Sequence, residues 1–228
     1  GCVNRIIKLS GVDGTVIWTK DIGGSFIAKD IAADSSGDVY VSLVNSGICK
    51  LSGVDGSQIW YYGNGEWGQR LATDSNNDVY LSSLERSHSS PVRKLSGVDG
   101  TVIWTNSDVG YNGSITTDDA NNVYVLSGSV KKVRKLSGVD GSEIWHSNTG
   151  TNLNSLAVDN NGHLYGGRFY DYYIGEIRKL SSTNGFEISI KDSIGVIDIA
   201  VENTKYVYVV YNSIVQKLST NPIYTIIS

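Results

Sequence analysis

One eleven-residue phrase recurs five times in the 228 residues of this chain. Four copies are nearly identical and one has diverged: KLSGVDGTVIW at 8–18 and 94–104, KLSGVDGSQIW at 50–60, KLSGVDGSEIW at 135–145 and KLSSTNGFEIS at 179–189. A second anchor recurs with nearly the same period and consists of Tyr40, Tyr80, Tyr124, Tyr165 and Tyr208. Two independent anchors with one period of roughly 40–45 residues indicate a single structural unit repeated along the chain.

Each unit has the pattern of four short β-strands. In residues 26–62 these are FIAKDIAAD, DVYVSL, ICKLS and SQIWYY, separated by SSG, NSG and GVDG. The runs are rich in β-branched and aromatic residues and are bounded by Gly, Asn and Asp, as strands and hairpins are. Asp-Gly, between the third and fourth strands, accepts the positive φ angles of a tight turn. No apolar pattern of helical period persists for two turns.

A four-stranded sheet of this size does not bury its own faces, and radial packing of such sheets solves the problem. Units of 40–45 residues with four strands are typical of β-propellers. The sequence therefore predicts an all-β fold, a β-propeller of four-stranded antiparallel blades. The Trp of the phrase is expected to pack between neighbouring blades, at Trp18, Trp60, Trp104 and Trp145.

We expect one propeller domain over residues 1–228, with a leading half-blade at 1–22 because the chain begins with a third and a fourth strand. Five complete blades are predicted to follow, with approximate bounds 23–62, 63–106, 107–148, 149–191 and 192–228. The chain contains no Met, so we expect it to be part of a longer chain whose earlier residues complete the half-blade. An overlapping five-bladed ring and completion by another chain are the alternatives.

Three segments resemble bacterial β-propeller repeats related to the NHL and SBBP repeats: IAADSSGDVYVSL at 31–43, LATDSNNDVYLSS at 71–83 and LAVDNNGHLYGGR at 156–168. KLSGVDGTVIW resembles the outer hairpin of pyrroloquinoline-quinone-type propeller repeats. Such repeats occur in secreted and surface proteins of bacteria, outer-membrane assembly lipoproteins and phage structural proteins, so the resemblance implies an extracellular, cell-surface or virion location. Quinoprotein dehydrogenases commonly add a disulfide of adjacent cysteines, which this chain lacks. The resemblance therefore implies neither an enzyme nor a cofactor.

Composition narrows the partners and the chemistry. The net charge of −4 gives no general attraction to nucleic acid or to anionic membranes, and no apolar run is long enough to span a bilayer. Cys2 and Cys49 form either one disulfide or none. The three histidines occupy unrelated repeat positions, and no nucleophile elbow, zinc-protease motif or phosphate loop occurs. We expect no catalytic residues and no metal site.

Charged residues recur at two repeat positions. The acids are expected to start turns by accepting backbone N–H bonds, with a cation-binding ring as the alternative; they are Asp34, Asp74, Asp118, Asp159 and Glu202. The lysines are expected to cover the outer sheet with their aliphatic stems and to keep their charge in water, with an anion-binding ring as the alternative. These are Lys8, Lys50, Lys94, Lys135, Lys179 and Lys217.

Four residues before the repeated acid, the residue type varies among Asp30, Arg70, Ser114, Ser155 and Asp198. The next position is uniformly apolar, as a core face is, with Ile31, Leu71, Ile115, Leu156 and Ile199. Strand alternation then places the variable set toward the central channel. The binding candidates at the channel mouth are Lys29, Asp30, Gln69, Arg70, Asn154 and Asp198. A water-filled channel with internal ion pairs is the alternative.

Two longer loops are rich in aromatic residues and form a second candidate surface: Tyr61, Tyr62 and Trp67 in one, Phe169, Tyr170, Tyr172 and Tyr173 in the other. Such side chains present rigid amphipathic area to a sugar or to a protein, although β-rich composition alone also produces them.

We predict a non-enzymatic propeller scaffold that mediates protein–protein contacts in a secreted, cell-surface or virion assembly, with another protein or further copies of itself as partner. A carbohydrate-binding propeller is the alternative, although the aromatic loops belong mainly to two units whereas a lectin predicts repeated pockets. A propeller enzyme using Asp30, Asp198 and Arg70 is the third hypothesis.

Overall fold

The computed structural model of the chain describes residues 5–23, 27–63, 65, 69–83, 91–109, 112–127, 132–147, 153–171, 174–193, 196–202, 204–211 and 214–219. The regular secondary structure of these residues is entirely β and forms six sheets. Within each sheet, strands consecutive in sequence pair antiparallel. No helix in this described part is long and apolar enough to cross a membrane. The predicted all-β propeller fold is confirmed.

Four sheets have four strands each. They are β3–β6 (Ala28–Ala33, Val39–Leu43, Gly47–Leu51, Gln58–Gly63), β7–β10 (Gln69–Thr73, Val79–Ser83, Val92–Leu95, Val102–Asn106), β11–β14 (Asn112–Thr117, Val123–Ser127, Lys132–Leu136, Glu143–Ser147) and β15–β18 (Leu153–Val158, Leu164–Asp171, Ile174–Leu180, Glu187–Ser193). The chain opens with the two-stranded sheet β1–β2 (Arg5–Leu9, Val16–Asp21). It closes with the three strands β19–β21 (Asp198–Glu202, Tyr206–Tyr211, Ile214–Ser219). The fourth strand predicted after β21 falls in residues 220–228, outside the described residues.

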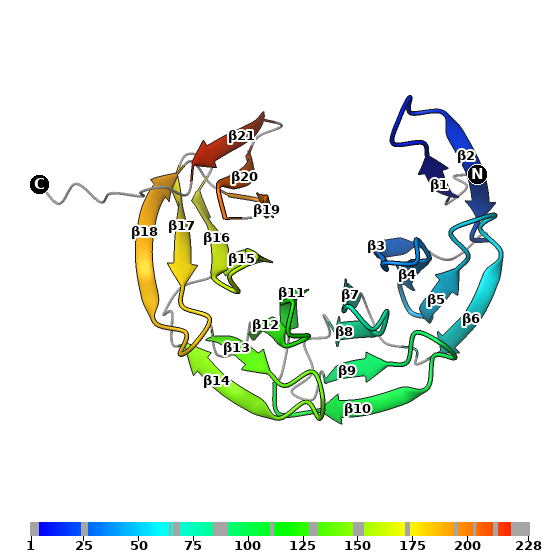
Figure 1. Ribbon diagram of the computed structural model, residues 1–228, viewed down its shortest axis with the longest axis horizontal. Helices are drawn as coiled ribbons and strands as arrows, with labels where there is room; N and C mark the ends of the chain where they lie inside the picture. Colours follow the sequence, from blue (N-terminus) through cyan, green and yellow to red (C-terminus); the bar gives the residue numbers. More distant parts are fainter. Residues whose placement is uncertain are drawn as a thin grey trace, which may run out of the picture.

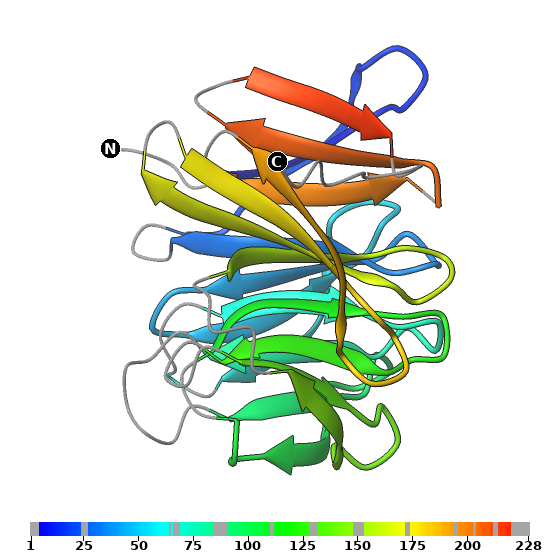
Figure 2. The same ribbon diagram turned by 90° about the vertical axis from the view of Figure 1, so that its left-hand side faces the viewer.

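The sheets follow one another around an open arc (Figure 1). The first strands β3, β7, β11, β15 and β19 line its inner side, and β6, β10, β14 and β18 form its outer side. The sheets β1–β2 and β19–β21 lie at the two ends of the arc. Seen from the side, the strands of successive sheets stack as twisted layers (Figure 2).

The repeated Trp joins each blade to the next, as predicted. Trp60 Nε1 donates a hydrogen bond to the Gly97 carbonyl at 3.2 Å, and its ring packs against Tyr40 with 5.7 Å between ring centroids. Gly100 has a φ of +75°, and a Cβ there would lie 2.8 Å from the Trp60 ring. The turn therefore requires Gly both for its backbone conformation and for the close approach of the indole. Trp18, Trp104 and Trp145 make the same bond to the next turn.

The repeated acid, the phrase Lys and the anchor Tyr lie together in each complete blade, and in the first three of these blades the Lys is buried. Asp34 Oδ1 accepts the backbone N–H groups of Ser36 and Asp38, which confirms the predicted turn role of this acid. Its other oxygen lies 3.1 Å from Lys50 Nζ and accepts the Tyr40 hydroxyl at 3.3 Å. Lys50 Nζ also donates to the Gly97 carbonyl of the next blade at 2.9 Å.

The prediction that the lysines keep their charge in water was therefore wrong for the middle blades. Lys50, Lys94 and Lys135 are buried, and each forms an ion pair with the acid of its own blade. The cause is the strand register, which places the Lys directly opposite the Tyr of the second strand and so above the acid that begins the turn. A buried cation needs such a partner, because desolvation of an unpaired charge costs several kcal/mol.

The apolar residue that follows the variable position is buried in every blade except the first complete one. Leu71, Ile115, Leu156 and Ile199 belong to the core between blades, as predicted, with exposed fractions of only 6–7%, whereas Ile31 is 56% exposed. Ile31 faces the two-stranded sheet β1–β2, which has no inner strands among the described residues.

Cys49 is a buried free thiol, so it is not in a disulfide.

Candidate functional site

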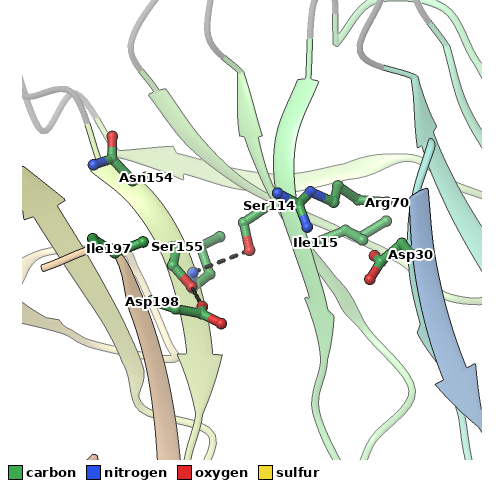
Figure 3. Close-up of a pocket in the computed structure, with 9 residues that line it drawn as sticks. Asp30, Arg70, Ser114, Ile115, Asn154, Ser155, Ile197 and Asp198 are labelled. Carbon is green, nitrogen blue, oxygen red and sulfur yellow. Dashed lines mark hydrogen bonds between the residues drawn. The ribbon is translucent and has the colours of Figure 1, made fainter. Parts of the chain in front are cut away.

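The variable polar residues of the first strands meet at a cavity of about 320 Å³ on the inner side of the arc. Five successive inner strands contribute to it, and its lining residues are Asp30, Arg70, Ser114, Ile115, Asn154, Ser155, Leu156, Ile197 and Asp198 (Figure 3). Four of the six channel-mouth candidates are thus brought together: Asp30, Arg70, Asn154 and Asp198. Their role in binding stays a prediction.

The other two candidates are not placed there. Lys29 is exposed and lines a separate cavity with Arg5, Ile6 and Ile7, on the side of the first blade that faces β1. Asp30 also lines this second cavity, and the pairing of β3 with β4 shifts register between Ala28 and Asp30. Lys29 therefore lies at a local irregularity of the strand, which directs its side chain away from the inner cavity. Gln69 belongs to β7, but its side chain lies outside the described residues.

Three of the cavity side chains tie neighbouring inner strands together. Asp30 Oδ2 accepts the backbone N–H of Leu71 at 2.9 Å, and Ser114 Oγ accepts that of Leu156 at 3.1 Å. Ser155 Oγ accepts the N–H of Ile199 at 3.4 Å. In each case the acceptor lies on one inner strand and the donor on the next, so these bonds join the inner edges of neighbouring sheets. We call them the inter-strand clasps.

The clasps were not predicted, although the sequence carries a signal for them. The position holds Asp or Ser in four of five units, and these are short side chains whose oxygens reach a backbone N–H close by.

Arg70 breaks this pattern. A guanidinium carries only donors, so it does not accept the N–H of Ile115 as the clasp would require. The Arg70 side chain instead extends from β7 across the cavity (Figure 3). Within the described part of the chain, its guanidinium makes no hydrogen bond and no ion pair. Arg70 is thus a cation presented to the cavity.

The opposite wall of the cavity carries Asp198. Its Oδ1 accepts the backbone N–H of Ile199 at 2.9 Å and also the hydroxyl of Ser155. Asn154 adds an exposed amide on the neighbouring strand. With Asp30, the cavity therefore holds two carboxylates and one guanidinium, a formal charge of −1. Among the described residues, no three His, Cys, Asp or Glu side chains are grouped to hold a metal ion.

The aromatic candidates are only partly described. Tyr61 is nearly half exposed, and its hydroxyl lies 2.7 Å from Ser46 Oγ and donates to the Ser46 carbonyl at 3.0 Å. Tyr62 packs against the core that contains Tyr40 and Trp60. Trp67, Tyr172 and Tyr173 lie outside the described residues. Phe169 and Tyr170 belong to β16, but their side chains are not described.

Comparison with known proteins supports the fold. No family model matches the chain, and no curated protein matches it either. A Bacteroides caccae protein of unknown function superposes with a TM-score of 0.64 at 13% identity, over 90% of this chain and 78% of that one. BamB from Moraxella catarrhalis superposes with a TM-score of 0.60 at 12% identity, over 95% of this chain and 77% of that one. At such low identity the similarity shows the propeller fold and carries no conclusion about function.

Proposed function

We propose that this chain is a non-enzymatic propeller scaffold that binds a protein partner, and that an acidic segment of the partner enters the central cavity and pairs with Arg70. The observation that carries the proposal is the broken clasp. At this position Asp30, Ser114 and Ser155 accept a backbone N–H of the next strand. Arg70 makes no such bond, and its guanidinium N–H groups are available to a ligand in the cavity.

The chemistry of the cavity favours a peptide over a simple anion. A guanidinium binds a carboxylate through two parallel hydrogen bonds, which makes it specific for planar acidic groups. The carboxylates of Asp30 and Asp198 repel a free anion, whereas a peptide brings backbone N–H donors to Asp198 together with its own acidic side chain. The volume of about 320 Å³ suits a few residues of such a segment.

The assembly in which the scaffold works is proposed from the repeats. Their resemblance to repeats of secreted, surface and phage structural proteins favours a secreted, cell-surface or virion assembly. A rigid array of packed sheets suits this role, because binding to a preformed site costs little ordering entropy.

The test uses fluorescein-labelled hexaglutamate as the probe and hexaglutamine as its neutral control, followed by fluorescence anisotropy at low salt. We expect hexaglutamate to bind, hexaglutamine not to bind, and 0.5 M salt to weaken binding through screening. Arg70→Ser should weaken binding at least tenfold. The matched control is Arg5→Ser, which removes the same charge from an exposed arginine paired with Asp21 and away from the cavity.

Arg70→Ser is also a sharp test of structure. Ser at this position restores the side chain found at Ser114 and Ser155, so it should form the clasp to Ile115 and leave the melting temperature unchanged or higher. If Arg70→Ser binds hexaglutamate as well as the unmodified protein does, or if both arginine variants lose binding equally, the proposal is wrong.

A further inference from the structure

The geometry points to a second binding surface, at the free edge of β1. We infer that this edge takes up a β-hairpin of the same type as β3–β4, carrying an Asp and, six residues later, a Tyr. In the four complete sheets the third strand lies between the second and the fourth. β1 holds the third-strand position of the phrase, yet in the described part of the chain it pairs only with β2.

The apolar side chains beside this edge are uncovered. Leu9 is 55% exposed, whereas its counterparts Leu51, Leu95, Leu136 and Leu180 are at most 1% exposed. Ile31, on the facing side of the first complete blade, is exposed where its counterparts are buried. Those counterparts pack against the Tyr of the preceding blade, as Leu71 does against the cluster of Tyr40 and Ile115 against that of Tyr80. The segment that covers Ile31 therefore has a Tyr at this place.

The surroundings of Lys8 indicate that the added hairpin carries an acidic residue. Like Lys50, it donates to a carbonyl of the next blade, here that of Gly53 at 2.6 Å. Lys50 also pairs with Asp34 at 3.1 Å and with Asp38 at 3.3 Å. Lys8 makes no ion pair with any described residue. Lys8 thus makes the contact to the next blade, but no described residue supplies a carboxylate to it within its own blade.

Gly11 gives a third, independent observation. At its counterparts Gly53, Gly97 and Gly138, a Cβ would lie within 1.9 Å of a carbonyl oxygen in the turn between the first two strands. At Gly11 a Cβ would meet no atom within 4 Å. The glycine is therefore not required by its present surroundings, whereas an added hairpin turn would require it.

These features specify the occupant. The hairpin needs an acid opposite Lys8, a Tyr over Ile31 and a turn that packs on Gly11. The hairpin β3–β4 has these features: Asp34 corresponds to the acid, Tyr40 to the Tyr, and the turn between them to the turn that would pack on Gly11. A second copy of the chain joined edge to edge at β1 would instead bring Lys8 toward Lys8, with neither acid nor Tyr. Charge complementarity therefore favours a separate repeat hairpin as the partner.

The test adds a labelled synthetic peptide of residues 27–44 to the full 228-residue chain and follows fluorescence anisotropy. We expect binding, with a rise in melting temperature as ligand linkage requires. Replacing Asp34 or Tyr40 in the peptide by Ala should weaken binding at least tenfold, and so should Lys8→Met in the protein. Gly11→Ala should also block binding while leaving the free protein as stable as before. Val12→Ala, at an exposed residue next to it, is the matched control and should bind normally.

A fusion keeps the test decisive if the free peptide does not fold. Residues 27–44 are placed before Gly1 through a flexible Gly-Ser linker, and the melting temperature should rise by several degrees. Gly11→Ala should abolish the rise. If neither peptide nor fusion has an effect, or if the effect survives both Gly11→Ala and Lys8→Met, the inference fails. A chain dimer that Leu9→Lys dissociates would show that a second copy covers this edge, and would also overturn it.

Discussion

The sheet β7–β10 in the middle of the arc and the sheet β19–β21 at its end contain the same polar cluster in different surroundings. Lys94 lies 3.0 Å from Asp74 in the first, and Lys217 lies 3.1 Å from Glu202 in the second. The side chains of the middle pair are 7% and 0% exposed, whereas those of the end pair are 45% and 50% exposed. The geometry is repeated, but the burial is not.

The next blade makes the difference. The Gly138 carbonyl of β11–β14's outer turn accepts a hydrogen bond from Lys94 at 3.1 Å, and the Asn121 carbonyl accepts one from Tyr80 at 3.2 Å. No described residue covers the end pair in this way. The sequence of one unit thus specifies the ion pair, while the next unit buries it and so sets how much it contributes to the free energy of unfolding. Other repeat proteins have nearest-neighbour stability of this kind.

The largest expected effect is that of Lys94→Ala. It leaves the buried Asp74 and the partly buried Asp78 without their cation, and breaking a buried pair in this way costs about 3–5 kcal/mol of unfolding free energy. Lys217→Ala, at the exposed counterpart, should leave the urea midpoint nearly unchanged. Equal losses in the two variants would contradict the view that the following blade sets the energetic weight of the cluster.

A smaller contrast is expected between two glycines of the repeated turn. Gly14 and Gly141 have φ angles of +73° and +75°, so an Ala costs about 1–2 kcal/mol at either. A Cβ at Gly141 would lie 2.6 Å from the Trp104 ring, whereas at Gly14 nothing lies within 4 Å. Gly141→Ala should therefore cost about 1–3 kcal/mol more in urea unfolding, the usual cost of overpacking. Similar losses would mean that the indole moves aside freely.

These contrasts show what the sequence could predict. The period, the strands, the Asp-Gly turns and the Trp between blades follow from local pattern, because each depends on residues within one hairpin and its copy. The burial of Lys50 could not be read from its own strand, since it depends on an acid sixteen residues earlier and a carbonyl in the next blade.

The candidate site was predictable in position but not in role. Strand alternation indicated that Asp30, Arg70 and Asp198 share the inner side of the arc. It did not show that Asp30 holds the backbone of Leu71, because that bond joins strands of two different repeats. Arg70 is an exception only in comparison with the clasps, and these depend on contacts between repeats that the sequence of one repeat does not show.

Raising the pH above 10 tests the ionisation of the buried tyrosines in the complete blades. Its effect on the stability of the fold should be more gradual than that of the substitutions above. Burial raises the pKa of Tyr40 from 10 to about 12, and it raises the pKa values of Tyr80, Tyr124 and Tyr165 as well. Below pH 10 these phenols are neutral in both states. Above it the unfolded chain loses protons that the folded chain keeps, so stability should fall as the pH rises from 10 to 12. Melting temperatures across this range, together with tyrosine absorbance at 295 nm, measure the effect. Tyr40→Phe should flatten the slope, and an unchanged slope would assign it to other groups.

The smallest expected effect concerns the first end of the arc, where Cys49 packs with Ile6 and Trp18 between β1–β2 and the first complete blade. Burial raises the pKa of the Cys49 thiol to about 11, so at pH 8 it should react with a disulfide reagent only through local opening. In a Cys2→Ser background, Trp18→Ala should speed this labelling severalfold while shifting the urea midpoint little, because among the described residues β1–β2 packs against one neighbouring sheet instead of two. The control is Trp104→Ala in the middle of the arc, which should lower the midpoint strongly, by about 3–5 kcal/mol in unfolding free energy. Were Trp18→Ala to lower the midpoint as much as Trp104→Ala does, the ends and the middle would be one cooperative unit, and the contrast between them would be one of exposure alone.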